Sequence, residues 1–295
     1  MSYILGKEGK PSQQMLTLVL AFIICAIVGM GVTMLMTPWA TKSANGLLLA
    51  NSVGQLIMFM APALWVALRY YQEPRRFLQI QHDKRTGRHL LWGLLLMVLV
   101  IPLNECLTSW NDSWHWSGVW STMESMLREM TERSNELIGG ALEKATVGQL
   151  LINLLAIALV PAVCEELFFR GAIQQIIYRW THRPHLSIVL TAAIFSLAHM
   201  DPFAFLPRFL LGILLGYMFY FSQSIWVDIA AHFLNNAIIV VLYFFYQKGM
   251  LTINIAEDMS FAWYIVLASA IVTAAVFYFA WLRKRKTEVE ITEIW

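Results

Sequence analysis

The chain has 295 residues, of which 58% are hydrophobic and 14% are charged, and its formal net charge is +2. Soluble domains average roughly 45–50% apolar and about 25% charged residues, so the composition excludes an ordinary soluble protein. The net charge itself says little, and we expect no nucleic acid as a partner. We therefore expect an all-α, polytopic membrane protein that is surrounded by membrane lipids.

Long apolar segments recur along the chain, and most of them reach the roughly 17–25 residues that cross a hydrocarbon core. The fifth segment is the shortest, because Pro184 and Pro202 bound it. We predict a helical bundle of about eight transmembrane helices. The apolar segments are Met15 to Met36, Leu47 to Leu68, Leu90 to Leu107, Val147 to Phe169, Leu186 to Ala198, Phe203 to Phe221, Ile225 to Tyr246 and Phe261 to Leu282.

The basic residues predict the orientation of the bundle, since cytoplasmic loops are enriched in Lys and Arg. If the amino terminus is inside, the inner segments contain Lys7, Lys10, the residues from Arg69 to Arg88, Arg179, Arg183 and the run from Arg283 to Lys286. The outer segments then contain only Lys42, Arg128, Arg133, Lys144 and Lys248. This asymmetry predicts that both termini are cytoplasmic.

The segment 110–146 separates the third and fourth apolar segments and is expected outside. Its tryptophans predict an aromatic belt at headgroup depth. Ser121 and Glu124 form a capping-box pattern, and apolar residues then recur at helical spacing, so we predict an interfacial helix that ends at Gly139-Gly140. This helix could simply cover the bundle, or it could act as a lid or a substrate-docking element. The tryptophans are Trp110, Trp114, Trp116 and Trp120.

The fourth apolar segment contains the unexpected sequence PAVCEELFFR, with Glu165, Glu166 and Arg170. A charge at the centre of a spanning helix costs about 2.5–3.5 kcal/mol, so each of these residues needs a partner or a function. Glu166 and Arg170 stand at i and i+4, the favourable spacing for a helical ion pair. Glu165 is turned about 100° away and remains unpaired. A carboxylate in that position suits proton transfer near neutral pH.

Two later segments carry further polar residues on single faces. His199 stands one turn after Phe195, and His232 and Asn236 stand at i and i+4. If these helices pack together, their polar faces converge with Glu165. The set would supply a base, a hydrogen-bonding partner and two oxyanion donors, so that water can attack without a serine or cysteine nucleophile.

These motifs resemble a known family. EELFFR resembles the EExxxR motif of the CPBP family, the intramembrane glutamic proteases that include type II CAAX prenyl endopeptidases and bacteriocin-processing and immunity (Abi-like) proteins. FSLAH, at 195–199, resembles its FxxxH motif, and HFLNN, at 232–236, resembles its HxxxN motif. The resemblance covers about residues 147–246.

The resemblance implies an intramembrane endopeptidase. It implies that Glu165 and His199 activate a water molecule, and that His232 and Asn236 hold the oxyanion of the scissile carbonyl. We expect no cofactor and assign no metal ligands. The substrate would be a membrane-associated protein or peptide of unknown identity, and the bacterial character of most such relatives suggests the bacterial cytoplasmic (inner) membrane.

The resemblance also assigns supporting roles to Glu166 and Arg170. We divide the chain into an N-terminal part (1–146), with helices one to three and the outer helix, a catalytic core (147–246) with the three motifs, and a final helix with a basic cytoplasmic tail (247–295).

Other interpretations of the same residues remain open. Two histidines and a glutamate could bind zinc, although Asn236 is a poor zinc ligand. Midplane acids and histidines also occur in proton-coupled transporters, and the motif residues could serve a non-enzymatic membrane scaffold. Glu105 and Asp228 are either structural or line the cavity. The Gly212 and Gly216 step predicts close helix packing. The sequence gives no oligomeric state.

Overall fold

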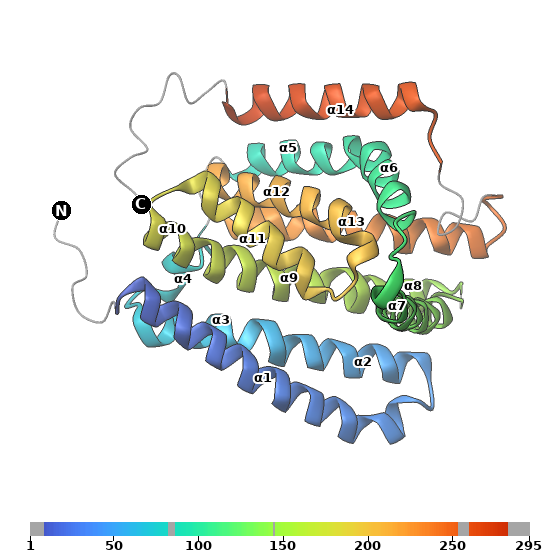
Figure 1. Ribbon diagram of the computed structural model, residues 1–295, viewed down its shortest axis with the longest axis horizontal. Coiled ribbons are helices and arrows are strands. Elements are labelled where there is room, and N and C mark those ends of the chain that lie inside the picture. Colours follow the sequence, from blue (N-terminus) through green and yellow to red (C-terminus); the bar gives the residue numbers. More distant parts are fainter. Residues whose placement is uncertain (1–8, 82–85, 144, 253–259, 283–295) are drawn as a thin grey trace.

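The computed structural model describes residues 9–81, 86–143, 145–252 and 260–282, and every regular element within these ranges is a helix (Figure 1). The all-α prediction is therefore confirmed. Lys7, Lys84, Arg85, Lys144 and the basic run from Arg283 to Lys286 lie outside the described residues. The helices are α1 (Pro11–Ala40), α2 (Ala44–Gln55), η1 (Leu56–Met60), α3 (Ala61–Tyr70), α4 (Pro74–Phe77), α5 (Thr86–Leu99), α6 (Ile101–Asp112), η2 (Gly118–Trp120), α7 (Ser121–Leu142), α8 (Val147–Asn153), η3 (Leu154–Leu159), α9 (Val160–Glu166), η4 (Leu167–Gln174), α10 (Gln175–Thr181), α11 (Pro184–Ala198), η5 (Pro202–Ala204), α12 (Phe205–Ser222), α13 (Ile225–Gln247), α14 (Trp263–Phe277) and η6 (Tyr278–Leu282).

Six continuous helical stretches of the described chain are long and apolar enough to cross a membrane. A seventh is obtained if α5 and α6 form one span, although they are bent by 46° at the break before α6, whose first turn contains Pro102. These helices are those of an integral multi-pass membrane protein. The six stretches are Pro11–Ala40, Ala44–Tyr70, Val147–Thr181, Pro202–Ser222, Ile225–Gln247 and Trp263–Trp281.

Of the eight predicted spans, only these six or seven are confirmed. The remaining candidate, α11, has 15 residues. A helix of that length extends about 22 Å, which is shorter than a hydrocarbon core of about 30 Å. Pro184 begins α11, and the left-handed backbone of Met200 (φ 55°) follows its end, so the helix cannot extend in either direction.

The stretch Val147–Thr181 is longer than the sequence predicted. It has 35 residues in all and ends at Thr181 rather than near Phe169. It includes two π-helical stretches, η3 and η4. π-helical turns are rare in proteins and occur frequently at functional sites. The glutamates of PAVCEELFFR end α9, and Arg170 lies within η4, in which every residue is buried.

The helices around this stretch pack closely. α13 contacts α9 and η3, while α12 lies against α11. A Cβ atom on Gly212 would lie 3.0 Å from the Cα atom of Ala192, and one on Gly216 would lie 2.9 Å from the Cγ2 atom of Ile188. The prediction that these glycines permit close helix packing is confirmed. In Figure 1, α9, α11, α12 and α13 lie between α1 on one side of the bundle and α14 on the other.

The outer helix α7 exists, but two details of its prediction are wrong. It continues through Gly139 and Gly140 to Leu142. Ser121 is its first residue rather than its cap, and the Ser121 hydroxyl donates to the Gly118 carbonyl. The Glu124 carboxylate has other partners, which are described below, so the capping box does not form.

Candidate active site

Glu166 and Arg170 form an ion pair that is 0% exposed, with Arg170 Nη1 donating to Glu166 Oε1 over 2.9 Å. The predicted pairing is therefore confirmed. Arg170 Nη2 also donates to the Gly212 carbonyl oxygen over 3.2 Å, and the guanidinium carbon lies 4.7 Å from the centroid of the Phe195 ring. Arg170 thus links its own helix to α12 and α11.

Glu166 has a second partner that the sequence did not indicate. His232 Nδ1 lies 2.8 Å from Glu166 Oε1, the same oxygen that accepts from Arg170. A carboxylate paired with a guanidinium is an acceptor only, so His232 Nδ1 carries a hydrogen and donates it. No local pattern could have indicated this contact, because it depends on the packing of α13 against α9.

Glu165 faces both histidines of the predicted site. Its Oε2 atom lies 3.9 Å from His199 Nε2 and 4.0 Å from His232 Nε2. These distances exceed the 2.7–3.2 Å or so of a direct hydrogen bond. Within the described part of the chain, Glu165 Oε2 has no hydrogen-bonding partner. The structure therefore brings His199 and His232 close to one carboxylate oxygen of Glu165.

His199 is oriented by its own helix. Its Nδ1 atom lies 2.8 Å from the Phe195 carbonyl oxygen, which can only accept, so Nδ1 carries the hydrogen. In a neutral ring, Nε2 then faces Glu165 as an acceptor. The His199 side chain is 30% exposed, compared with 11% for Glu165 and 8% for His232, so the site opens on the His199 side.

Asn236 lies one turn beyond His232 on α13 and is half-buried. Its Oδ1 atom accepts a hydrogen bond from Asn235 Nδ2 over 3.2 Å. Because Oδ1 already accepts this hydrogen bond, Nδ2 is the atom of the Asn236 side chain that can donate to a substrate.

The turn that follows His199 is fixed by Asn111 of α6. Asn111 is 0% exposed; its Nδ2 atom donates to the Pro202 carbonyl over 3.0 Å, and its Oδ1 atom accepts from the Leu206 amide over 2.7 Å. Asp201, within the same turn, forms an ion pair of 3.0 Å with Arg208. These contacts hold the backbone on which His199 stands, and sequence reasoning missed Asn111 because its partners are main-chain groups far along the chain.

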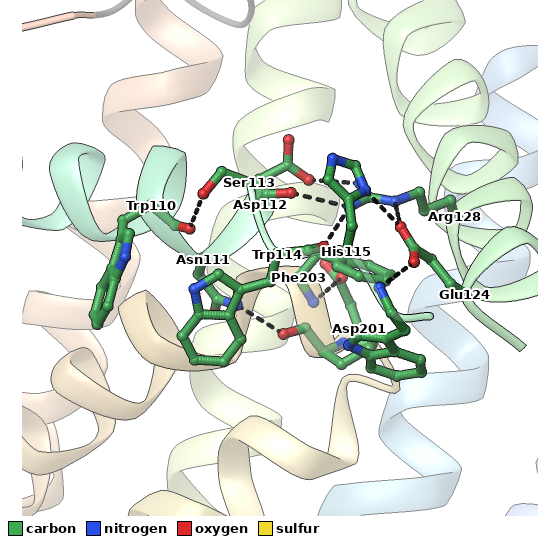
Figure 2. Close-up of polar contacts among 12 residues, drawn as sticks. Trp110, Asn111, Asp112, Ser113, Trp114, His115, Glu124, Arg128, Asp201 and Phe203 are labelled. Atoms are coloured by element: carbon green, nitrogen blue, oxygen red, sulfur yellow. Dashed lines mark hydrogen bonds and ion pairs between the residues drawn. The ribbon is translucent and has the colours of Figure 1, made fainter. Parts of the chain in front are cut away.

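Arg128 of α7 joins the outer helix to the same turn (Figure 2). Its Nε atom donates to Glu124 Oε1 over 2.9 Å, and its Nη1 atom donates to Asp112 Oδ1 over 2.8 Å. Its Nη2 atom donates to the carbonyl of Trp114 over 3.0 Å, and the guanidinium carbon lies 3.8 Å from the centroid of the Phe203 ring. The residue thus connects α7, the end of α6 and the segment that follows His199.

Glu124 is the anionic partner in this contact. The amide of Trp116 donates to its Oε2 atom over 2.6 Å, and His115 Nδ1 lies 3.0 Å from Oε1. The Trp116 amide, followed by Arg128 and His115, lowers the pKa of Glu124 from 4.5 to about 2. Glu124 is therefore an anion throughout the neutral range.

The other end of α7 is also anchored. Asn153 Nδ2, on α8, donates to the Ala141 carbonyl over 3.1 Å and its Oδ1 accepts from Gln149 over 2.9 Å. Since both ends of α7 are held, the structure favours a helix that covers the bundle over a freely moving lid. Within the described ranges, no three His, Cys, Asp or Glu side chains are grouped closely enough to hold a metal ion.

Comparison with known families supports the resemblance that the motifs indicated. Residues 147–238 match the family described as type II CAAX prenyl endopeptidase Rce1-like. The comparisons with curated proteins and with solved structures found no match. The matched segment contains the buried cluster of Glu165, Glu166 and His232, which is consistent with an active site. The chain therefore carries, in residues 147–238, a domain of the Rce1-like type II CAAX prenyl endopeptidase (CPBP) family.

Proposed function

We propose that this protein is an intramembrane endopeptidase in which Glu165 and His199 activate a water molecule. The observation that carries the proposal is the position of Glu165 Oε2, which lies 3.9 Å from His199 Nε2 and 4.0 Å from His232 Nε2. Polar groups at such distances are commonly bridged by water. The family match in residues 147–238 supports a proteolytic function for this arrangement.

In the proposed reaction, Glu165 takes a proton from the water while His199 Nε2 accepts the water's other hydrogen as a hydrogen bond. The water oxygen forms a bond to the carbonyl carbon of the substrate, and the carbonyl oxygen becomes an oxyanion. Glu165 then gives its proton to the amide nitrogen, the C–N bond breaks, and an acid and an amine leave. Such proton transfer typically contributes about 10²–10⁴-fold in rate.

His232 and Asn236 are the proposed donors to the oxyanion, through Nε2 and Nδ2. Preorganised donors of this kind stabilise charge that develops only in the transition state. Glu166 and Arg170 support them indirectly: Glu166 Oε1 holds the His232 ring over 2.8 Å, and Arg170 holds Glu166 over 2.9 Å.

The proposed substrate is a membrane-associated protein or peptide, because the site lies among apolar helices and is most exposed at His199.

We further propose that the protein resides in a bacterial cytoplasmic membrane with both termini in the cytoplasm. In this topology α11 completes a bundle of eight helices, although it is too short to span the membrane alone. Cysteine labelling at engineered loop positions in intact cells would test this topology.

The proposal is tested with the purified full chain in lipid vesicles and a library of peptides, with mass spectrometry of the products. Glu165→Gln should abolish cleavage, while Glu129→Gln, on the exposed face of α7, should cleave like wild type. A parallel proteomic comparison of membranes with wild type or Glu165→Gln should reveal precursors that accumulate only with the variant. Absence of any cleavage by wild type, or full cleavage by Glu165→Gln, would contradict the proposal.

A further inference from the structure

His199 stands on a turn rather than within a helix. α11 ends at Ala198, and His199 is the first residue of the turn that leads to α12. The next residue, Met200, has a left-handed backbone (φ 55°), which is unfavourable for a residue with a side chain. Such conformations persist only where the surrounding structure determines them. The position of the His199 ring therefore depends on the contacts that hold this turn.

Phe203 is the buried aromatic side chain of the turn, with 5% of its surface exposed. Its amide donates to Asp201 Oδ1 over 3.1 Å, which ties its backbone to the preceding residues. The guanidinium carbon of Arg128 lies 3.8 Å from the centroid of the Phe203 ring, and the Trp116 ring centroid lies 5.5 Å away. A guanidinium over an aromatic face is attracted to it, most strongly where water is excluded. Two groups from the segment 116–128 thus hold the ring.

Arg128 is itself fixed in place (Figure 2). Its Nε atom donates to Glu124, its Nη1 atom donates to the Asp112 carboxylate, and its Nη2 atom donates to the Trp114 carbonyl. Because a guanidinium is planar and its donors point in fixed directions, these bonds also fix the plane that lies over Phe203. Arg128 therefore cannot follow Phe203 if the turn moves, and it restrains the ring instead.

The backbone of the turn is held from the same region. Asn111, near the end of α6, donates to the Pro202 carbonyl over 3.0 Å and accepts from the Leu206 amide over 2.7 Å. All of these contacts come from residues 111–128, which lie outside the segment 147–238 that matches the family. A turn within the family domain is thus framed by a part of the chain that does not belong to it.

We propose that Arg128 is a positioning residue for His199 and acts through the ring of Phe203. By holding this ring it fixes the turn, and with it the gap of 3.9 Å between His199 Nε2 and Glu165 Oε2 in which the proposed water binds. A misplacement of about 1 Å in an active site can lower a rate by about 10²-fold. The effect on cleavage rests on the proposed function, whereas the hold of Arg128 on the turn exists without substrate.

The first experiment examines the turn directly and needs no activity. NMR follows hydrogen exchange of the Phe203 and Leu206 amides, which donate to Asp201 and Asn111, in the full chain as wild type and as Arg128→Gln. Both amides should exchange at least about tenfold faster in the variant, while the amides of α13 should change by less than about twofold. Unchanged exchange of both turn amides, or equally faster exchange throughout α13, would overturn the proposal.

Two further variants control this experiment. Arg133→Gln is the matched control, because the ion pair of Arg133 with Glu129 also has i, i+4 spacing but lies within α7 alone. It should leave the exchange of the Leu206 amide as in wild type. Phe203→Leu keeps an apolar side chain but removes the ring, so it should accelerate exchange as Arg128→Gln does without breaking the other bonds of Arg128. Wild-type exchange of the Leu206 amide in Phe203→Leu would contradict a role for the ring.

The second experiment measures cleavage. Arg128→Gln should lower kcat by about 10–100-fold with KM within about twofold, because it displaces a group that acts on the water rather than one that binds the substrate. In a His199→Gln background the same substitution should change the remaining kcat by less than about twofold, since the ring that Arg128 positions is absent. A general loss of folded protein would lower both rates equally, and that result would overturn the positioning role.

The outcomes separate this proposal from the proposed function. If wild type cleaves nothing, the proposed function fails, while hydrogen exchange still decides whether Arg128 holds the turn. If Glu165→Gln abolishes cleavage but Arg128→Gln cleaves like wild type, the positioning role fails and the peptidase stands.

Discussion

His232 contacts Glu166 Oε1 over 2.8 Å through Nδ1, and this places its Nε2 atom 4.0 Å from Glu165 Oε2. The two adjacent glutamates therefore lie near different nitrogens of the His232 ring, Glu166 near Nδ1 and Glu165 near Nε2. Glu166 holds the ring in place, and Glu165 remains available on its other side. This division depends on the angular separation of neighbouring residues on a helix, about 100°.

Breaking the buried ion pair should destabilise the fold. We expect Arg170→Met to lower the free energy of unfolding by about 3–5 kcal/mol, because it leaves Glu166 buried without its cation. The double variant with Glu166→Gln should lose less than the sum of the two single variants. Denaturant titration of the protein in micelles would measure all three, and strictly additive losses would contradict the prediction.

Substitution of His199 should affect activity rather than stability. Its side chain is 30% exposed and its ring makes one hydrogen bond to the Phe195 carbonyl, so His199→Gln should change the free energy of unfolding by less than about 1 kcal/mol. Cleavage should fall by about 10²–10⁴-fold if the ring accepts a hydrogen bond from water. Thermal unfolding and peptide cleavage, measured on the same preparation, would separate these effects. Unchanged cleavage would refute the role of His199.

The glycines of α12 offer a test of helix packing. Gly212→Ala would bring a Cβ atom to 3.0 Å from the Ala192 backbone, so α11 and α12 must separate. We expect a loss of about 1–3 kcal/mol and weakened cleavage, since Arg170 also bonds the Gly212 carbonyl. Gly140→Ala, in α7, has no neighbour within 4 Å and is the matched control. It should be neutral or slightly stabilising.

The contact between Glu124 and Arg128 should survive mild acid. Glu124 has a pKa of about 2 in the folded protein, lowered from 4.5, so its contribution to stability is complete above pH 4.5 and is lost as the pH falls toward 2. Hydrogen exchange of the Trp116 amide, which donates to Glu124, should therefore stay protected at pH 5 and become unprotected near pH 2.

Glu124→Gln provides the comparison for that experiment. It removes the carboxylate, so the Trp116 amide should exchange faster at pH 5 and its protection should lose its dependence on pH between 4.5 and 2. Equal protection in wild type and variant would show that Glu124 does not hold this segment.

Much of the fold could be predicted from residue patterns, since apolar length identifies most of the spans and the spacing of Glu166 and Arg170 identifies their ion pair. The residue patterns gave a wrong prediction, or none, where tertiary contacts determine the hydrogen-bonding partners of a side chain. Glu124 bonds Trp116 and Arg128 rather than capping α7, and Asn111 bonds main-chain groups that only the fold brings near. Local periodicity contains no information about such partners.

The pairing of Glu166 with Arg170 also has a consequence for biosynthesis. Both charges belong to one continuous helix, Val147–Thr181, so they can neutralise each other before any later helix has been made. Glu166 and Arg170 therefore need no partner from a later helix to compensate each other's charge. His232 arrives only with α13, so an incomplete nascent chain would already reside in the lipid but would hold no assembled site. The group formed by Glu165, His199 and His232 is therefore complete only after α13 has been made.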